Sequence, residues 1–259
     1  MQYQLSRIVA GPFLRGLWRP EVSGAEHVPE TGGAILASNH LSILDSVFLP
    51  FMLKRPVTFT AKSEYFTSRH PAMRLMGTYL RATGQIPVDR AGARAAQATL
   101  EAALALLQQG HLFGIYPEGT RSPDGRLYRA RPGVGWLAMN SGLPVIPVAM
   151  FGTDRVLPPG QSVPRLGKVR IKIGKPMTFA VDGSGADGSG ADGSGADGSR
   201  VDGSGADGAK PMAPAKMRRA IADEVVQAIH ELSGQEYVPM YASVRKEQLA
   251  AEAAAAKDS

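Results

Sequence analysis

The sequence predicts an α/β fold with a central, mostly parallel or mixed sheet that is flanked by helices. Short apolar runs bounded by turn residues alternate along the chain with longer segments of helical periodicity, as an α/β domain requires. Of the 259 residues, 44% are hydrophobic, which is enough for one substantial core. Cysteine is absent, which excludes disulfides and thiol nucleophiles and fits a reducing compartment. We therefore expect one large domain with appendages at both ends.

Residues 1–20 are expected to form an N-terminal amphipathic helix. Apolar side chains alternate there with arginines, no acid precedes Glu21, and Gly11 and Pro12 mark a bend. Such a helix either lies in a membrane interface or covers the core of the protein, and the composition favours the two readings equally.

Residues 21–181 are expected to form the main domain. Its predicted strands are residues 33–39, 57–61, 144–150 and 168–174, and residues 111–119 are expected to be a strand entering a loop. Predicted helices follow Asp45, begin near Pro71, and cover residues 93–109 up to Gly110. Loops at the strand ends are then available for a functional site.

Residues 182–208 repeat Asp, Gly and Ser with a period of five. This composition buries too little apolar area to offset the entropy of ordering, which predicts a flexible linker. A calcium-binding β-roll is disfavoured because its period is nine and because alanine occupies the apolar anchor position here. Residues 209–259 are expected to form a helix around 214–232 and an alanine-rich tail, which either pack on the body or fray, with nothing catalytic among them.

Charge is distributed unevenly along the chain. Residues 182–208 carry six aspartates and one arginine, a local charge of −5. Because the whole chain has a net charge of +6, the remaining residues carry +6 − (−5) = +11. A basic body suggests an anionic partner: nucleic acid, a phosphorylated substrate or an anionic membrane surface. Nucleic acid is disfavoured because the basic stretches lack interleaved aromatics and any recognised motif.

No segment of the sequence reads as a transmembrane helix or a secretory signal. The longest apolar run, residues 134–151, contains Asn140, Pro144 and Pro147 and therefore predicts a helix, a turn and a buried strand. We expect a peripheral protein on the cytoplasmic face of the cell membrane. Neither composition nor motif indicates an oligomeric state.

His40 and Asp45 are the ionisable residues of the otherwise apolar stretch "NHLSILD". On one regular helix, five positions turn the side chain by about 500°, so the two could not touch. They meet only if His40 lies in the strand-to-helix turn and Asp45 reaches back from the first turn of the helix. A carboxylate in contact with an imidazole fixes its tautomer and makes the other nitrogen a general base. The alternative is a buried histidine beside a helix cap.

Three further stretches carry candidate chemistry. "YPEGTRS", residues 116–122, offers backbone N–H groups and a guanidinium that suit a phosphate, with Glu118 available for a substrate hydroxyl or for an ion pair with Arg121. "GQIPVDR" ends in Asp89 and Arg90, and "VIPV" reads as a buried strand. The other histidines show no metal-ligand spacing, so we expect no metal site. Ser42 lies inside the first motif without a dedicated base, which disfavours a nucleophilic role.

Taken together, "NHLSILD", "GQIPVDR", "YPEGTRS" and "VIPV", in this order, resemble the glycerolipid acyltransferase family typified by 1-acylglycerol-3-phosphate acyltransferase. The resemblance spans roughly residues 22–175. It does not cover the linker or the C-terminal segment, which we expect to be additions of this chain's lineage. A lipid-binding scaffold that kept the fold without catalysis is the remaining alternative, and the intact pair His40 and Asp45 argues against it.

The resemblance implies that His40 is the general base and Asp45 its orienting partner. It implies a glycerol-phosphate site made of Arg90, Glu118, Gly119, Thr120 and Arg121; Lys62, Arg126, Arg129 and Arg131 are secondary candidates from the basic surface. It also implies an acyl donor, acyl-CoA or acyl carrier protein, and lysophosphatidic acid as acceptor, with no cofactor. Glycerol 3-phosphate or another lysolipid is the alternative acceptor.

Overall fold

The computed structural model describes residues 11–67, 74, 77–78, 80–81, 84–88, 93–161, 163–179 and 214–256. The side chains of Lys62, Pro87, Val88 and Ala93 are outside this description. The expected linker at residues 182–208 also lies outside the described residues, as does most of the helix expected near Pro71.

A six-stranded sheet with the order β1-β9-β8-β2-β6-β3 forms the centre of the molecule. Its strands are β1 (Glu21–Ser23), β2 (Ala34–Ser38), β3 (Val57–Thr58), β6 (Leu112–Ile115), β8 (Val145–Phe151) and β9 (Arg170–Ile173). All pairs are parallel except β8 with β9, so the sheet is mixed, and the predicted fold class is confirmed. Every residue of β2 is buried because this strand lies between β8 and β6.

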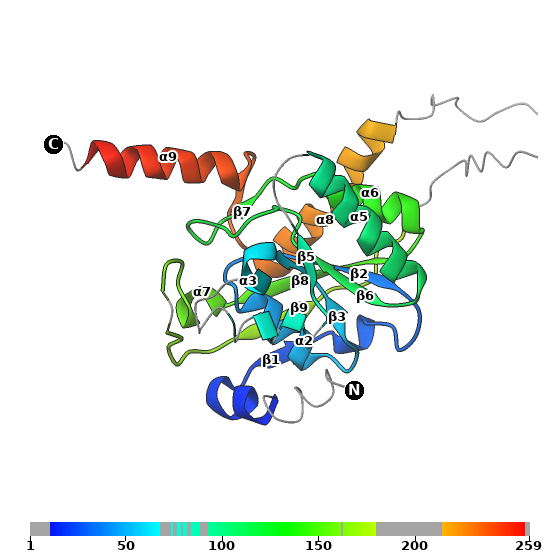
Figure 1. Ribbon diagram of the computed structural model, residues 1–259, viewed down its shortest axis with the longest axis horizontal. Coiled ribbons are helices and arrows are strands. Elements are labelled where there is room, and N and C mark those ends of the chain that lie inside the picture. The colour runs from blue at the N-terminus through cyan, green and yellow to red at the C-terminus, as the bar shows by residue number, and fades with distance from the viewer. Residues whose placement is uncertain are drawn as a thin grey trace, which may run out of the picture.

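Alternate side chains of the sheet supply two separate cores, as the pleat of a strand requires. On one face, Ala34 and Leu36 pack with α2 (Asp45–Met52) and with Trp18. On the other face, Ile35 and Ala37 pack with α5 (Ala93–Gln108), α6 (Gly133–Ser141) and α8 (Pro214–Ser233). Figure 1 shows the sheet in the middle of the body with these helices around it. Helices therefore cover both faces, which leaves the carboxyl ends of the parallel strands for a site.

The single strand predicted at residues 57–61 is wrong, because the chain changes partner at Phe59. Val57 and Thr58 form β3 of the main sheet, whereas β4 (Thr60–Lys62) pairs with β5 (Ile86–Val88) in a separate two-stranded sheet. The backbone N–H of Phe59 donates to Gln85 Oε1 at 2.7 Å. This contact satisfies the N–H where the strand leaves the main sheet.

The N-terminal helix combines features of both predicted roles. Residues 11–18 are helical, Trp18 is buried in the core beside α2, and Leu14 packs against the same core. Phe13 and Leu17 on the same helix are 65% and 42% exposed. The helix therefore covers the core with one side and presents apolar side chains to solvent with another.

The C-terminal segment packs back on the body through α8 and a short strand. Ile221, Val225 and Ile229 of α8 are buried against the sheet. β10 (Tyr237–Val238) then pairs in parallel with β7 (Leu127–Tyr128), which directly follows the "YPEGTRS" loop. The last helix, α9 (Ala242–Ala255), starts at this point and projects from the body (Figure 1).

The remaining short elements connect these units. They are the 3-10 helix η1 (Ala25–His27), α3 (Ser63–Thr67) and α7 (Thr153–Val156). Within the described ranges, no helix combines the length and the apolar character that crossing a membrane requires.

Candidate active site

His40 and Asp45 are in direct contact at the carboxyl end of β2. The chain leaves β2 at Ser38, and α2 begins at Asp45, so His40 lies in the turn between the two elements. His40 Nδ1 lies 2.9 Å from Asp45 Oδ2. A carboxylate only accepts, so Nδ1 carries the proton and the lone pair of the neutral ring is on Nε2. The His40 side chain is 11% exposed and that of Asp45 only 1%.

The Asp45 carboxylate is held by four donors, which fixes its orientation. Oδ2 also accepts from the backbone N–H groups of Leu41 at 2.7 Å and Ser42 at 2.8 Å. Oδ1 accepts from the hydroxyl of Thr153 at 2.5 Å. These donors keep a buried carboxylate hydrogen-bonded. The hydroxyl of Ser42 donates to the Leu157 carbonyl at 2.9 Å.

Tyr116 stacks on the imidazole of His40, a contact that sequence reasoning missed. The ring centroids are 3.7 Å apart and the planes are 9° from parallel. The Tyr116 hydroxyl lies 2.7 Å from Ser46 Oγ on α2, and the ring of Phe59 also stacks with the tyrosine ring, with centroids 5.1 Å apart. Gly114 allows this arrangement because a Cβ there would overlap the Phe59 ring. Tyr116 therefore confines the imidazole to one plane.

Glu118 fastens the "YPEGTRS" loop to the backbone of the histidine turn. It is 1% exposed; its Oε1 accepts from the His40 N–H at 3.1 Å, and its Oε2 accepts from the Tyr128 N–H at 3.0 Å. The pKa of Glu118 is raised to about 8, mainly because the carboxyl is buried; the charge of Asp45 also raises this pKa, whereas the two backbone N–H groups and the positive charge of Lys246 lower it. Ser122 N–H donates to the His40 carbonyl at 2.7 Å, so the loop and the turn are joined twice.

The rest of the loop lies beside this junction. Gly119 has a φ of +74°, a left-handed backbone that favours glycine, and the Arg131 side chain lies against the space where a Cβ would project. Gly119 is exposed, and Thr120 and Arg121 are half-buried. Glu118 and Ser122 thus join the loop that carries Gly119, Thr120 and Arg121 to the turn of His40, whereas Arg90 lies outside the described residues.

The secondary candidates have partners away from the histidine. Arg126 donates to Asp124 Oδ2 through Nη2 at 2.6 Å. The guanidinium groups of Arg129 and Arg131 lie over the Tyr241 ring, 5.7 Å and 5.2 Å from its centroid. Lys62 belongs to β4, and its side chain is not described. Arg126, Arg129 and Arg131 therefore connect the loop region to its surroundings, and a phosphate contact by these residues stays a prediction.

Asn39 and Gln235 form a second link that the sequence did not reveal. Asn39 exchanges two hydrogen bonds with the backbone of Met150 on β8, at 2.7 Å and 3.1 Å. Its Nδ2 also donates to Gln235 Oε1 at 2.7 Å, and Gln235 Nε2 donates to the Gly125 carbonyl at 2.6 Å. The C-terminal segment therefore bridges the residue before His40 and the loop after Arg121. In the sequence, the only signal of this link was the asparagine that begins the "NHLSILD" stretch.

Among the described residues, no three His, Asp or Glu side chains gather closely enough to hold an ion. What the geometry offers is a buried Asp-His pair and an adjacent loop with an exposed glycine, a hydroxyl and a guanidinium. This arrangement can take a proton from a bound alcohol and hold an anion beside it.

Residues 19–151, about half of the chain, match the family model described as Acyltransferase. The chain belongs to this acyltransferase family. The matched range contains His40, Asp45 and residues 116–122.

Curated relatives are named for one activity. The chain is 28% identical over 175 residues to "1-acyl-sn-glycerol-3-phosphate acyltransferase BAT2, chloroplastic" from Brassica napus, which covers 67% of this chain and 49% of the relative. It is 34% identical over 146 residues to the 1-acyl-sn-glycerol-3-phosphate acyltransferase of Pseudomonas aeruginosa. That match covers 56% of this chain and 52% of the relative. The chain thus spans about half the length of the curated relatives it matches.

A solved structure shares the fold of this acyltransferase-family chain. The 1-acyl-sn-glycerophosphate (LPA) acyltransferase PlsC from Thermotoga maritima matches with a TM-score of 0.57 and 23% identity, over 89% of this chain and 79% of that one. This match covers more of the chain than the family model does, which ends at residue 151.

Proposed function

We propose that this acyltransferase moves a fatty acyl group from acyl-CoA or acyl carrier protein to the free hydroxyl of lysophosphatidic acid and so forms phosphatidic acid for phospholipid synthesis. The observation that carries the proposal is the contact between His40 Nδ1 and Asp45 Oδ2, fastened to the "YPEGTRS" loop through Glu118. The names of the two acyltransferases compared above support the choice of acceptor.

In the proposed reaction, His40 acts as general base. Its Nε2 takes the proton of the acceptor hydroxyl as the oxygen attacks the thioester carbonyl carbon. Asp45, held by its four donors, keeps Nδ1 protonated and stabilises the imidazolium. The tetrahedral intermediate then expels the thiolate, which takes the proton from Nε2. A thiol has a pKa of about 8–9, so the leaving group needs little acid assistance and the reaction needs no metal or cofactor.

The acceptor's phosphate is proposed to bind at the loop beside His40. Thr120 and Arg121 offer a hydroxyl and a guanidinium, Gly119 offers exposed backbone, and Arg90 is the further predicted ligand. Glu118 is proposed to act by holding this loop against the backbone of His40, because both of its oxygens accept backbone N–H groups. A phosphate there would place the glycerol hydroxyl near the imidazole.

Peripheral binding to an anionic membrane surface is proposed to bring the enzyme to its lipid. Trp18 Nε1 donates to the Arg165 carbonyl at 2.8 Å, which joins the N-terminal helix to the loop after α7. Both pieces expose apolar side chains; Val163 and Leu166 are 75% and 73% exposed. Exposed basic residues accompany them: Arg15, Arg19, Arg165, Lys168 and Arg170. Apolar insertion together with basic charge suits an anionic lipid surface.

The experiment that tests the function offers the purified protein several acceptors and donors. Acceptors are the two lysophosphatidate regioisomers, glycerol 3-phosphate and other lysophospholipids; donors are acyl-CoAs of several lengths and acyl carrier protein. Mass spectrometry of the products is expected to show phosphatidic acid from lysophosphatidate. Preferred acylation of glycerol 3-phosphate, or no transfer to any acceptor, would contradict the proposal.

The membrane arm is tested by flotation with vesicles that contain phosphatidylglycerol. Replacing Val163 and Leu166 by glutamate is expected to weaken vesicle binding while leaving the rate on short-chain, water-soluble substrates unchanged. Equal flotation of the variant and the original protein would show that this loop is not part of the membrane-binding surface.

A further inference from the structure

The first turns of α9 lie against the "YPEGTRS" loop although they are more than 100 residues further along the chain. Lys246 Nζ lies 2.6 Å from Thr120 Oγ1. The side chain of Lys246 is half-buried, and its charge acts on buried Glu118 of the same loop. The family match ends at residue 151, so this cation comes from outside it.

Three residues that precede Lys246 in sequence anchor the start of its helix to the body. Tyr241 lies under the guanidinium groups of Arg129 and Arg131, and Ala242 is fully buried. Arg131 Nη2 also donates to Ser243 Oγ at 3.3 Å. The start of α9 is therefore packed on the residues that follow the loop, even though most of the helix projects from the body.

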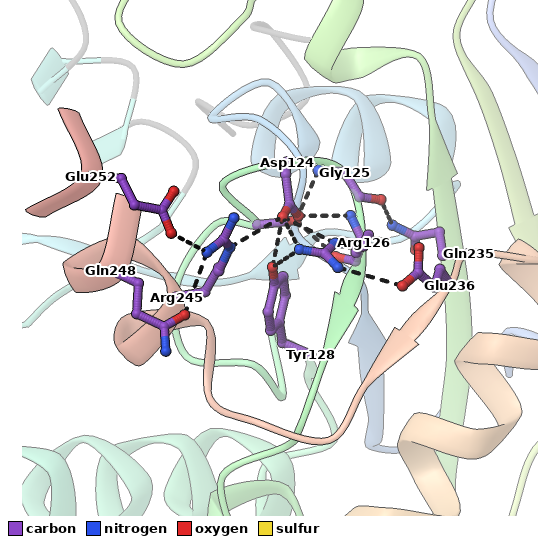
Figure 2. Close-up of polar contacts among 10 residues, drawn as sticks. Asp124, Gly125, Arg126, Tyr128, Gln235, Glu236, Arg245, Gln248 and Glu252 are labelled. Atoms are coloured by element: carbon purple, nitrogen blue, oxygen red, sulfur yellow. Dashed lines mark hydrogen bonds and ion pairs between the residues drawn. The ribbon is translucent and has the colours of Figure 1, made fainter. Parts of the chain in front are cut away.

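Arg245 ties the same turn to a carboxylate at the end of the loop. Its Nε lies 4.0 Å from Asp124 Oδ2, and its Nη1 donates to Glu252 at 3.0 Å. Asp124 in turn accepts from Arg126 and from the Tyr128 hydroxyl. Figure 2 shows these side chains from the residues just after the loop, from β7 and from α9 meeting around Asp124. These contacts hold the turn of α9 that also carries Lys246 beside the segment that follows the loop.

We propose that Lys246 is a further ligand of the acceptor's phosphate, supplied to the loop by the C-terminal helix. A lysine ammonium has three donors, so it can keep its contact with Thr120 and still donate to a phosphate oxygen. Arg121 and the exposed backbone of Gly119 lie on the same loop, and a dianionic phosphate would be shared among them. This inference rests on the proposed function for the identity of the acceptor.

A lysine that only braced the loop would behave differently from one that binds phosphate. Bracing stabilises the loop for every acceptor, so its loss changes the rate with all of them. A phosphate ligand matters only for acceptors that carry a phosphate. The two roles are separated by comparing lysophosphatidate with monoacylglycerol, which has the same glycerol hydroxyls and no phosphate.

The test uses the full chain with Lys246→Ala, Lys246→Gln and Lys246→Arg, and Lys216→Ala as the matched control. Lys216 is an exposed lysine of α8, so its removal changes the net charge equally. Loss of a hydrogen bond to a charged group is worth about tenfold in affinity or more. We expect Lys246→Ala and Lys246→Gln to raise KM for lysophosphatidate about tenfold with a smaller change in kcat, Lys246→Arg to recover most of it, and Lys216→Ala to change neither. Rates with monoacylglycerol are expected to be the same in all variants.

Calorimetric binding of glycerol 3-phosphate supplies a readout that does not depend on acyl transfer. Lys246→Ala is expected to bind this probe about tenfold more weakly than the original protein does, even if lysophosphatidate proves not to be the acceptor. Equal binding by the two proteins, or no binding by the original protein, overturns the inference. Equal losses with both acceptors would also overturn it, because they would identify Lys246 as a brace. Absence of transfer to lysophosphatidate, with binding still dependent on Lys246, would contradict the proposed function alone.

Discussion

The histidine turn and the "YPEGTRS" loop are held in place by different kinds of contact. Three of the four donors to Asp45 belong to residues three to five positions earlier in the chain. The loop region is held instead by partners 78 to 126 residues away, among them His40, Gln235, Ser243 and Lys246. The proposed base is therefore organised mainly by its own motif, and the proposed phosphate site by the tertiary structure.

This difference separates what each region needs in order to work. A local ring of donors forms whenever β2 and α2 form, because the same seven residues supply both the acceptor and most of the donors. The loop, by contrast, needs the C-terminal segment to be docked. Changes in the turn should therefore affect the chemical step, whereas changes in the loop's anchors should affect substrate binding and stability.

Removal of the imidazole should give the largest effect. His40→Ala deletes the proposed base and leaves Asp45 with its other three donors. We expect the rate of acyl transfer to fall by about 10³-fold or more, with the melting temperature nearly unchanged. Measured turnover within tenfold of the original protein would exclude His40 as the general base.

Asp45→Asn tests the negative charge of residue 45 while keeping a side chain of the same shape among its hydrogen-bond donors. Asparagine keeps one oxygen for the N–H donors and can direct its amide to the Thr153 hydroxyl, which also accepts. The neutral amide no longer stabilises an imidazolium. We expect turnover to fall about 10²- to 10³-fold in steady-state kinetics. A change in KM alone would argue that Asp45 is a structural cap.

Glu118→Gln tests how Glu118, which joins the loop to the histidine turn, contributes to stability at different pH values. Burial raises the pKa of Glu118 from 4.5 to about 8, so between these values the folded protein holds a proton that the unfolded chain releases. Its contribution to the free energy of unfolding is present at low pH and is lost as pH rises towards 8. The stability advantage of the original protein over Glu118→Gln should therefore shrink between pH 5 and pH 8.

Thermal unfolding of both proteins across this range measures that advantage. Asp45 and Lys246, the charged groups that act on Glu118, are present in both, so their own titration largely cancels in the difference. A difference that is constant with pH would mean that Glu118 stays ionised throughout.

Asp124→Ala should give the smallest effect on kinetics and stability, and this effect should be confined to the loop region. It removes the acceptor shared by Arg126, Tyr128 and Arg245, in a position that is partly exposed. We expect the melting temperature to fall by about 2–4 °C and KM for the phosphate-bearing acceptor to rise a few fold, with kcat retained. Glu101→Ala, which removes a carboxylate from the exposed face of α5, is the control. A larger loss of kcat than of binding would contradict the division between the two regions.

The sequence predicted the fold class and most of the strands because apolar periodicity is a local property. The five-residue spacing required His40 to lie outside the helix of Asp45 if the two were to touch, the strand and helix pattern placed it in the turn, and the structure shows that geometry. The sequence did not predict that the chain leaves the main sheet at Phe59, since that change depends on Gln85, a residue 26 positions away. Tyr116 lay inside a recognised motif, but its stacking on His40 depends on how β6 lies beside β2.

The sequence by itself determined the acyltransferase motifs, the proposed Asp-His pair and the uneven charge of the chain. Only the tertiary structure decided that the C-terminal segment contacts the candidate site: Gln235 bonds Asn39, β10 pairs with β7, and Lys246 reaches Thr120. Periodicity and spacing describe residues within a few turns of one another. Contacts between segments more than 100 residues apart are selected by packing of the whole chain, which no local pattern contains.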